Sequence, residues 1–348
     1  MPPPELLVTL SRAGQPESEH YGSIAVVDEN GRLIAHAGDP LKPTFLRSCA
    51  KPFQALPVIS SGVHHRFGFT DPELAVMAGS HSGQAVHIEA VRSILSKIGL
   101  SETALLCGAH APHTSSVLHN NCSGKHAGML AVAMDMGLSA SDYLEQDHPI
   151  QKIIREGMAH FLNIKAEDLV MGTDGCSAPT FLLPLVSIAH LFARLAVPLP
   201  PSAMSAPSVP TSISLVGSGR SWSRADALAM MAQIMMKHPE MVAGDGRLDT
   251  EVMRVCPGAM VMKGGAEGVQ GIGVVKAPGH TGPLGIAFKI SDGNGRRGAG
   301  PVAIEILRQL RVIEEGQLKV LSRFWRFPEK NHRGLEVGQV KAEFHLKT

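Results

Sequence analysis

The sequence predicts an α/β protein in which strands from both ends of the chain form one mostly antiparallel sheet, with a largely helical segment inserted between them. Two observations lead to this prediction. Runs rich in Val, Ile and Leu occur near the start and again after residue 259. Between them, apolar residues recur with helical spacing. We therefore expect a sheet-containing part formed by residues 1–45 and 259–348, and a mostly helical lobe formed by residues 46–258.

The first strands are expected to form an antiparallel meander. Residues 6–10 and 22–27 have strand-like composition. Asn30-Gly31 then predicts a tight turn to a third strand at residues 32–35, because both residues accept the positive φ angles of a hairpin turn.

The middle of the chain predicts helices. Apolar residues recur at helical spacing in six segments, residues 55–59, 71–78, 85–98, 123–136, 148–161 and 223–237. Asp71, Ser82, Ser123 and Ser223 are candidate N-terminal caps. The apolar stretch 181–199 is interrupted by prolines and charges, so we expect a buried helix and no membrane span.

Strand character returns after residue 259. Residues 269–275 and 284–290 are expected to be strands, followed by a helix at residues 300–310 and a last strand near residues 336–345. Residues 197–221 are rich in Pro and Ser and predict a surface loop.

Composition excludes several classes of partner. The chain has 32 Lys and Arg against 31 Asp and Glu, so we expect neither nucleic acid nor an anionic membrane as a partner. Five cysteines without disulfide-framework spacing fit a reducing compartment. The N-terminus lacks the pattern of a signal peptide. We therefore expect a cytoplasmic protein.

The motif Ser48-x-x-Lys51 places a hydroxyl and an amine on one face of a helix. Pro52 is tolerated only in the first helical turn, so Ser48 is expected at or just before the helix N-terminus, where free N–H groups favour negative charge. Taken alone, the motif also fits a capping serine beside a solvated lysine.

Two further motifs follow in order, Ser80-His81 in a loop and Lys263 ahead of a strand. Serine acyl-transferases of the β-lactamase and penicillin-binding class show the same succession. An isolated lysine has a pKa of about 10.4 and is protonated at neutral pH. A second ammonium group nearby and partial burial lower that pKa, which explains why two lysines and two hydroxyls belong together. We expect His81 to support the loop through hydrogen bonds.

Two cysteines in the helical lobe are open to more than one interpretation. Cys122 and Cys176 either share a zinc ion or are simply buried, and their spacing decides nothing. Asp174, in a Thr-Asp-Gly turn, either binds a substrate ammonium group or shapes the turn. The remaining cysteines, Cys49, Cys107 and Cys256, are expected to be buried.

Long sequence blocks add a resemblance to a known family. The blocks are residues 47–54, 80–83, 120–129, 173–176 and 263–270, and the similarity extends to residues 11–12, 17–22, 289–293 and 331–334. They resemble the signature blocks of the class 3, rhizobial-type L-asparaginases, the asparaginase II family. The resemblance implies a fold similar to that of serine β-lactamases and glutaminases, and a homodimer that acts on L-asparagine.

The same resemblance implies roles for particular residues. It implies two catalytic pairs, Ser48 with Lys51 and Ser80 with Lys263. It also implies a zinc ion, with its ligands being Cys122, Lys125 and Cys176. The residues that we expect to bind the substrate are Arg47, His81 and Asp174.

These residues suggest a covalent mechanism as the leading hypothesis. Neutral Lys51 takes the proton of Ser48, whose oxygen attacks the side-chain amide of asparagine. One alternative is a zinc amidohydrolase in which metal-bound water attacks and Ser48 only positions the substrate. Another is a non-catalytic module that binds an amide or a metal.

Overall fold

The computed structural model describes residues 2–109, 116–200 and 222–348. By their mutual contacts these residues form two units. The sheet unit comprises Met1–Cys49, Phe181–Val197 and Asp245–Thr348, and the helical unit comprises Ala50–Thr180 and Pro198–Gly244. The sequence-based division placed residues 46–49, 181–197 and 245–258 in the helical lobe, whereas the structure groups them with the sheet. Most of the predicted connector, residues 201–221, lies outside the described residues.

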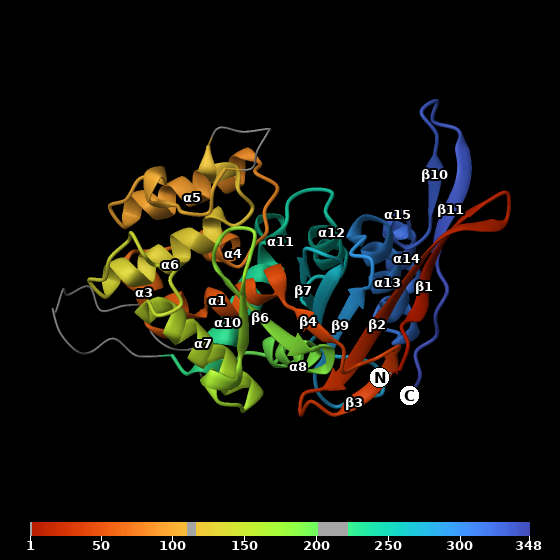
Figure 1. Ribbon diagram of the computed structural model, residues 1–348, viewed down its shortest axis with the longest axis horizontal. Coiled ribbons are helices and arrows are strands. Elements are labelled where there is room, and N and C mark those ends of the chain that lie inside the picture. The colour runs from red at the N-terminus through yellow and green to blue at the C-terminus, as the bar shows by residue number, and fades with distance from the viewer. Residues whose placement is uncertain (1, 110–115, 201–221) are drawn as a thin grey trace. The chain divides into compact units, whose positions relative to one another are not determined.

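The sheet is formed by strands from both ends of the chain, as predicted (Figure 1). In spatial order its strands are β10 (Phe327–Lys330), β11 (Glu336–Ala342), β1 (Glu5–Arg12), β2 (Gln15–Asp28), β9 (Leu284–Ile290), β8 (Val269–Val274) and β7 (Met260–Gly265), and β3 (Leu33–Ala37) also pairs with β2. Neighbouring strands are antiparallel. An ion pair of 2.7 Å between Lys347 Nζ and Glu5 Oε2 joins the two ends of the chain. The predicted α/β class, with an antiparallel sheet formed by strands from both ends of the chain, is therefore confirmed.

The hairpin β7–β8 contains one strand, β7, that the sequence analysis did not predict as a separate element. Residues 269–275 were expected to be a strand, which is β8, but Lys263 also lies on a strand, β7. The connecting turn contains Glu267 and Gly268 with φ angles of 63° and 67°. Gly268 accepts such an angle without strain, whereas Glu267 does so at a steric cost. Because glutamate is not a residue that predicts a positive φ angle, the residue type at position 267 did not indicate the turn.

The predicted helix at residues 181–199 is partly wrong. Its first residues belong to β6 (Pro179–Pro184), which pairs with β4 (Pro43–Phe45), and α8 (Leu185–Leu195) begins only after Pro184. A residue before proline is pushed out of the helical region, so Pro184 separates the two elements. The run Phe-Leu-Leu is apolar in either structure, and its hydrophobicity alone could not distinguish them.

The helix α8 lies against the sheet at glycine positions. A Cβ atom on Gly285 of β9 would overlap the carbonyl oxygen of Ala189, and one on Gly271 of β8 would overlap the ring of Phe192. These glycines let the helix backbone approach the strands closely. The other helices of the unit are α12 (Leu248–Val255), α13 (Gly295–Gln309), α14 (Glu315–Val320) and α15 (Ser322–Trp325).

The helical unit is assembled around α6 (Ser123–Asp135), which is buried from its first residue through Ala133. A Cβ atom on Gly124 would overlap the carbonyl oxygen of Val76, so α6 packs closely on α4. The other elements are α1 (Lys51–Gln54), α2 (Leu56–Ser60), α3 (Val63–Arg66), α4 (Asp71–Met77), α5 (Ala85–Lys97), α7 (Pro149–Leu162), α10 (Arg224–Lys237), α11 (Pro239–Val242), the short 3₁₀ helices η2 (Glu102–Ala104), η3 (Val117–His119) and η4 (Ala166–Asp168), and the strand β5 (Val170–Thr173).

The helix caps agree with the sequence analysis only in part. Ser223 caps α10 by accepting a hydrogen bond from the N–H of Asp226, as predicted. The N-caps of α4 and α5 are Thr70 and Gln84, not Asp71 and Ser82. Thr70 forms a capping box with Glu73, a stronger arrangement than Asp71 would provide one residue later.

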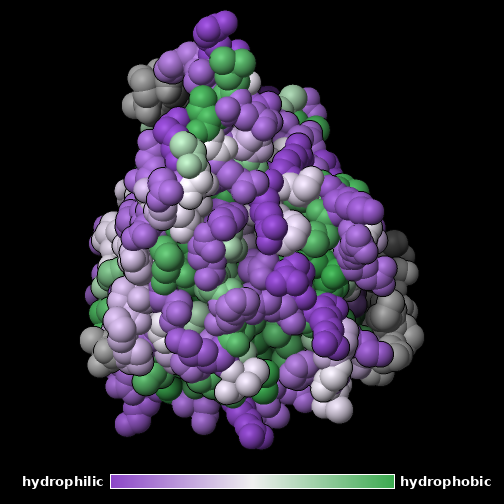
Figure 2. Space-filling view, turned by 90° about the vertical axis from the view of Figure 1, so that its right-hand side faces the viewer, coloured by the Kyte–Doolittle hydropathy of each residue, from purple (hydrophilic) through white to green (hydrophobic). Residues whose placement is uncertain are grey.

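Figure 2 shows one face of the sheet unit, on which hydrophobic residues are interspersed with hydrophilic ones. Within the described part of the chain, every helix is too short or too polar to cross a membrane.

Candidate active site

The segment that carries Ser48 is a tight, partly strained turn. The 3₁₀ helix η1 (Arg47–Ala50) leads directly into α1, which is a single turn. Arg47 has a φ of 50°, a left-handed conformation that costs a non-glycine residue about 1–2 kcal/mol. The hydrogen bond from Leu46 N to Phe181 O, 2.9 Å long, ties the start of this turn to β6.

This geometry corrects the helix-dipole argument of the sequence analysis. Ser48 lies inside η1, one residue after its start, and not before an extended helix. A helical segment of two turns has a small dipole, so individual N–H groups have to provide any stabilisation of negative charge.

Lys263 lies on the edge strand β7, and its side chain is completely buried. Its Nζ donates a hydrogen bond of 2.7 Å to the carbonyl oxygen of Gly264. The thiol of Cys49, the residue after Ser48, donates to the carbonyl oxygen of Lys263 at 3.0 Å. Burial raises the pKa of Cys49 to about 12, so this thiol stays protonated and remains a donor. The Ser48 turn and the Lys263 strand are thus joined within the sheet unit.

Lys51 and Ser80 are hydrogen-bonded in the helical unit. Lys51 Nζ lies 2.9 Å from Ser80 Oγ and 2.8 Å from the carbonyl oxygen of Asn121. The Lys51 side chain is fully buried, and this burial lowers its pKa. Cys122 is a further hydrogen-bonding partner of Lys51, and its charge opposes the effect of burial, but burial is the larger effect. The neutral amine that results can take a proton.

Cys122, Lys125 and Cys176 form a buried cluster in the same unit. Lys125 Nζ lies 3.1 Å from Cys176 Sγ. The hydrogen bond from the Cys176 thiol lowers the pKa of Cys122 well below its usual range. Burial by itself would lower the pKa of Lys125, but the sulfur atoms of the two cysteines outweigh burial and raise it. The cluster therefore stabilises a thiolate beside an ammonium group.

The donor atoms of this cluster fit zinc. Zinc prefers sulfur and nitrogen ligands, and two sulfurs with one amine nitrogen leave a fourth position for another ligand. In the described part of the chain, no group of three His, Cys, Asp or Glu side chains could hold a metal. A metal at this cluster would therefore require the amine of Lys125, which must lose its proton to bind.

His81 has both ring nitrogens in hydrogen bonds. Nδ1 accepts from the N–H of Gly83 at 3.2 Å, so Nε2 carries the proton and donates to Ser123 Oγ at 2.9 Å. The ring stacks on that of His87, with centroids 5.1 Å apart. Burial lowers the pKa of His81 well below its usual range. This neutral imidazole supports the loop that carries Ser80.

Asp174 lies in a turn just before Cys176. Its backbone N–H donates to Ala178 O, and its Oδ1 accepts from the N–H of Gly175 at 2.8 Å. Its negative charge also contributes to the raised pKa of Lys125. Asp174 therefore shapes the turn and acts on the cysteine cluster electrostatically.

The predicted residues thus gather in two groups, one in each unit. The sheet unit contains Arg47, Ser48 and Lys263, and the helical unit contains Lys51, Ser80, His81, Cys122, Lys125, Asp174 and Cys176. Sequence reasoning missed the hydrogen-bonding roles of Cys49 and Asn121. Asn121 acts through its backbone carbonyl, which no residue type encodes, whereas Cys49 lies next to Ser48 and its position was a usable signal.

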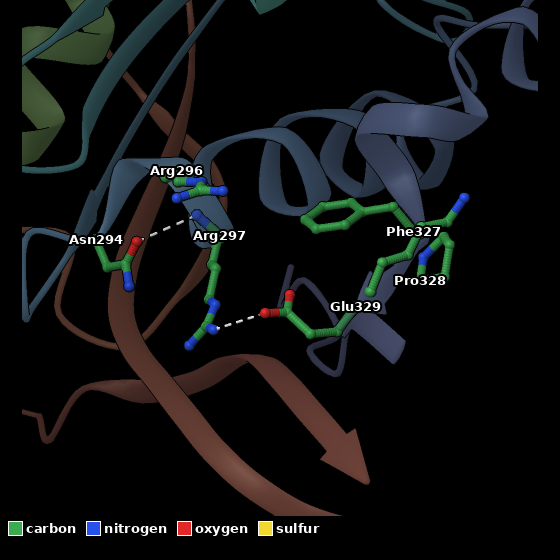
Figure 3. A pocket seen from close by; sticks show the side chains of 7 residues that line it. Asn294, Arg296, Arg297, Phe327, Pro328 and Glu329 are labelled. Atoms are coloured by element: carbon green, nitrogen blue, oxygen red, sulfur yellow. Dashed lines mark hydrogen bonds and ion pairs between the residues drawn. The ribbon is translucent and has the colours of Figure 1, made fainter. Parts of the chain in front are cut away.

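A pocket elsewhere in the sheet unit is not lined by any of these residues. It has a volume of about 450 Å³ and lies where α13 begins beside β10 (Figure 3). Arg297 extends across it to Glu329, with a nitrogen–oxygen distance of 3.1 Å. Its lining residues are Asn294, Arg296, Arg297, Phe327, Pro328, Glu329 and Lys330.

Comparison with known proteins defines the class of the chain. Residues 8–342 match the family model of L-asparaginase II. The chain belongs to this family, whose membership implies amidohydrolase activity toward asparagine, and the family resemblance predicted from the sequence blocks is confirmed. A search of curated proteins found no match.

Solved structures that resemble the chain include two glutaminases. A Bacillus glutaminase crystallised in 4.3 M NaCl has 12% sequence identity and a TM-score of 0.39, and the match covers 84% of this chain and 91% of the glutaminase. A probable glutaminase from Bacillus subtilis in complex with 6-diazo-5-oxo-L-norleucine has 12% identity and a TM-score of 0.38, with 84% of each chain covered.

Proposed function

We propose that the protein hydrolyses L-asparagine to L-aspartate and ammonia through a covalent intermediate on Ser48. The observation that carries this proposal is the buried Lys51, whose amine lies 2.9 Å from Ser80 Oγ and whose pKa is lowered by burial. Ser48 lies three residues before Lys51 in the continuous segment formed by η1 and α1. A general base and a hydroxyl nucleophile are thereby carried by successive turns of one segment.

In the first half of the reaction, Lys51 Nζ accepts the proton of Ser48 Oγ as this oxygen attacks the side-chain amide carbon of asparagine. The carbon–nitrogen bond then breaks. The departing nitrogen takes a proton and leaves as ammonia, so that a β-aspartyl ester of Ser48 remains. We assign the relay of this proton to Ser80 and Lys263.

In the second half, a water molecule gives up a proton to the same basic group and attacks the ester carbonyl. The bond to Ser48 Oγ breaks, the oxygen regains a proton, and aspartate is released. Removing or moving one well-oriented base costs typically 10²–10⁴-fold in rate, which is the contribution that we assign to Lys51.

We propose that charged groups outside the reacting centre hold the amino acid. Arg47 suits the substrate α-carboxylate, because guanidinium groups bind carboxylates through paired hydrogen bonds. Asp174 suits the α-ammonium group. We assign His81 to the substrate-binding group through its support of the Ser80 loop, since both of its ring nitrogens are already engaged.

We further propose that Cys122, Lys125 and Cys176 hold a zinc ion. When bound there, zinc would supply positive charge that orders the surrounding groups and orients the substrate. Five buried, free cysteines support a cytoplasmic location, because unpaired thiols persist in reducing compartments. The homodimer implied by the family resemblance is part of the same proposal.

Substitution of the nucleophile tests the covalent mechanism. Ser48→Ala should abolish release of ammonia from asparagine, whereas Ser82→Ala should keep it, because Ser82 has no role in the proposed chemistry. A rapid quench of the wild-type reaction followed by mass spectrometry should detect the β-aspartyl ester on the peptide that contains Ser48.

Other outcomes would support the alternatives. Ser48→Ala with near-wild-type turnover would refute the covalent mechanism and favour attack by metal-bound water. Absence of ammonia release by the zinc-loaded wild type would favour a non-catalytic binding module.

A further inference from the structure

A buried carboxylate, Asp249, lies behind the strand that carries Lys263. Asp249 is in the first turn of α12 and is 7% exposed. Its Oδ2 accepts a hydrogen bond of 2.7 Å from the backbone N–H of Gly264, and its Oδ1 accepts one of 2.8 Å from Nε2 of Gln270. Both carboxylate oxygens are therefore bound to the hairpin β7–β8.

The position of these bonds in the sheet explains why a side chain is needed. β7 is an edge strand, and in an antiparallel pair alternate residues point their N–H and C=O groups away from the neighbouring strand. Gly264 lies opposite Gln270 and directs its N–H to Asp249. Within the described residues no strand follows β7 in the sheet, and Asp249 supplies the partner that such a strand would have provided.

The carbonyl group of the same residue holds the amine of Lys263. Gly264 O accepts the hydrogen bond from Lys263 Nζ at 2.7 Å. The Gly264 backbone is thus held at its N–H by Asp249 and binds the lysine amine through its C=O. A side chain on Gly264 would crowd the hydrogen-bonded group formed with Asp249 and Gln270, because a Cβ atom on Gly264 would lie 3.0 Å from Gln270 Oε1.

Gln270, on the neighbouring strand β8, is the second residue that binds Asp249. Its side chain is buried, and its amide nitrogen reaches Asp249 Oδ1 and, at 3.4 Å, the carbonyl oxygen of Gly271. Gly271 is paired with Lys263 across the hairpin. Asp249 is thus bonded to the residue that follows Lys263 and, through Gln270, is linked to the residue paired with Lys263.

We propose that Asp249 is a positioning residue for Lys263: its carboxylate fixes the Gly264 backbone, whose carbonyl holds the Lys263 amine where it can transfer a proton. This inference rests on the proposed role of Lys263 in catalysis. Asp249 acts through hydrogen bonds and does not itself touch the substrate.

Two substitutions separate the hydrogen bonds from the charge. Asp249→Ala removes both acceptors. Asp249→Asn keeps an acceptor for Gly264 N–H, and a flip of the Gln270 amide restores the second bond with donor and acceptor exchanged. Positioning by hydrogen bonds therefore predicts that Asp249→Asn retains activity and Asp249→Ala does not.

Steady-state kinetics of ammonia release from asparagine provide the readout. We expect Asp249→Ala to lower kcat by about 10-fold to 100-fold with KM changed less than about threefold, because a displaced proton-transfer group slows the chemical step. We expect Asp249→Asn to stay within about threefold of the wild-type kcat. Gln270→Met, which removes one anchor and keeps the carboxylate, should fall between them. Asp39 is a buried residue of the sheet unit whose carboxylate accepts a hydrogen bond from the N–H of Leu41. Asp39→Asn is the matched control, and its kcat should equal that of the wild type.

The double variant isolates the link to Lys263. Because Asp249 acts through Lys263, Asp249→Ala should cause no further loss of kcat in a Lys263→Met background. Thermal unfolding of each variant identifies those that fold. If Asp249→Ala does not fold, the single variants Asp249→Asn and Gln270→Met still test the proposal, through the activity expected of each.

The outcomes distinguish this inference from the proposed function. If Lys263→Met keeps near-wild-type turnover, the proposed catalytic role of Lys263 fails and the inference fails with it. If Lys263→Met is inactive while folded Asp249→Ala keeps its kcat, only the inference is overturned. Equal loss in Asp249→Asn and Asp249→Ala, or a further loss in the double variant, would also overturn it.

Discussion

Lys51 can act as a base only if its amine is neutral. A lysine in water is protonated at neutral pH and cannot act as a base. Burial lowers the pKa of Lys51, whose amine is held by Ser80 Oγ, Asn121 O and Cys122. The charge of Cys122 opposes this shift, but burial is the larger effect, so the pKa of Lys51 moves in the direction that favours the neutral amine.

Replacement of Lys51 should separate a requirement for a base from a requirement for charge. Lys51→Met removes both the base and the charge, and Lys51→Arg keeps a charge that cannot be neutralised. We expect each to lower kcat by at least about 100-fold, as for loss of a general base. Lys152 is an exposed lysine of α7, and Lys152→Met serves as the control in the same ammonia-release assay. Substantial activity of Lys51→Arg would show that Lys51 supplies charge and does not take a proton.

At the scale of elements, local chemistry predicted some structure well. Asn30-Gly31 indicated the β2–β3 hairpin, and Ser223 indicated the start of α10, because turn angles and caps are local properties. The boundary between β6 and α8 was not predicted, because the apolar run before Pro184 fits both a strand and a helix. Pairing with β4, which lies far away in sequence, decides between them.

Glycines have opposite effects at different elements, and this can be tested. In Gly285→Ala the new Cβ atom would meet backbone atoms of α8, which have no room to move, so we expect destabilisation by about 3 kcal/mol or more. In Gly157→Ala, inside α7, the new Cβ atom would have nothing within 4 Å. Here we expect stabilisation by up to about 1 kcal/mol from helix propensity alone.

Urea unfolding of the two glycine variants beside the wild type measures both changes in the free energy of unfolding. A Gly285→Ala protein as stable as the wild type would mean that α8 does not lie as close to β9 as the structure has it. Destabilisation by Gly157→Ala would mean that α7 depends on its glycine for a reason other than space.

At the scale of the whole molecule, the sequence indicated the sheet from both termini because strand-like composition occurs at both ends. It could not reveal the pairing order, in which β1 lies between β11 and β2, because pairing between distant strands leaves no local signal. The site residues were predicted largely through long sequence blocks that resemble one family. Physical reasoning on spacing alone left the two cysteines undecided, since proximity between Cys122 and Cys176 arises from the packing of the helical unit.

The zinc proposal makes a prediction about the intact protein. We expect about one zinc per chain after purification without chelators, and its loss in Cys122→Ala and in Cys176→Ala, because each removes a sulfur ligand. Cys256→Ala is the matched control: this thiol is also buried, and burial raises its pKa to about 11, but it belongs to the sheet unit. Plasma mass spectrometry of the four proteins gives the metal content directly.

Removal of the metal should also change stability and activity in a definite way. Zinc at 100 times its dissociation constant should stabilise the folded protein by about 2.7 kcal/mol, so chelation should lower the Tm of the wild type and leave that of Cys176→Ala unchanged. Because the proposed nucleophile is Ser48, chelated enzyme should still form the β-aspartyl ester, although at higher asparagine concentration. Complete loss of the ester on chelation, with full recovery on adding zinc, would contradict a role limited to orientation. It would assign the metal to the chemical step.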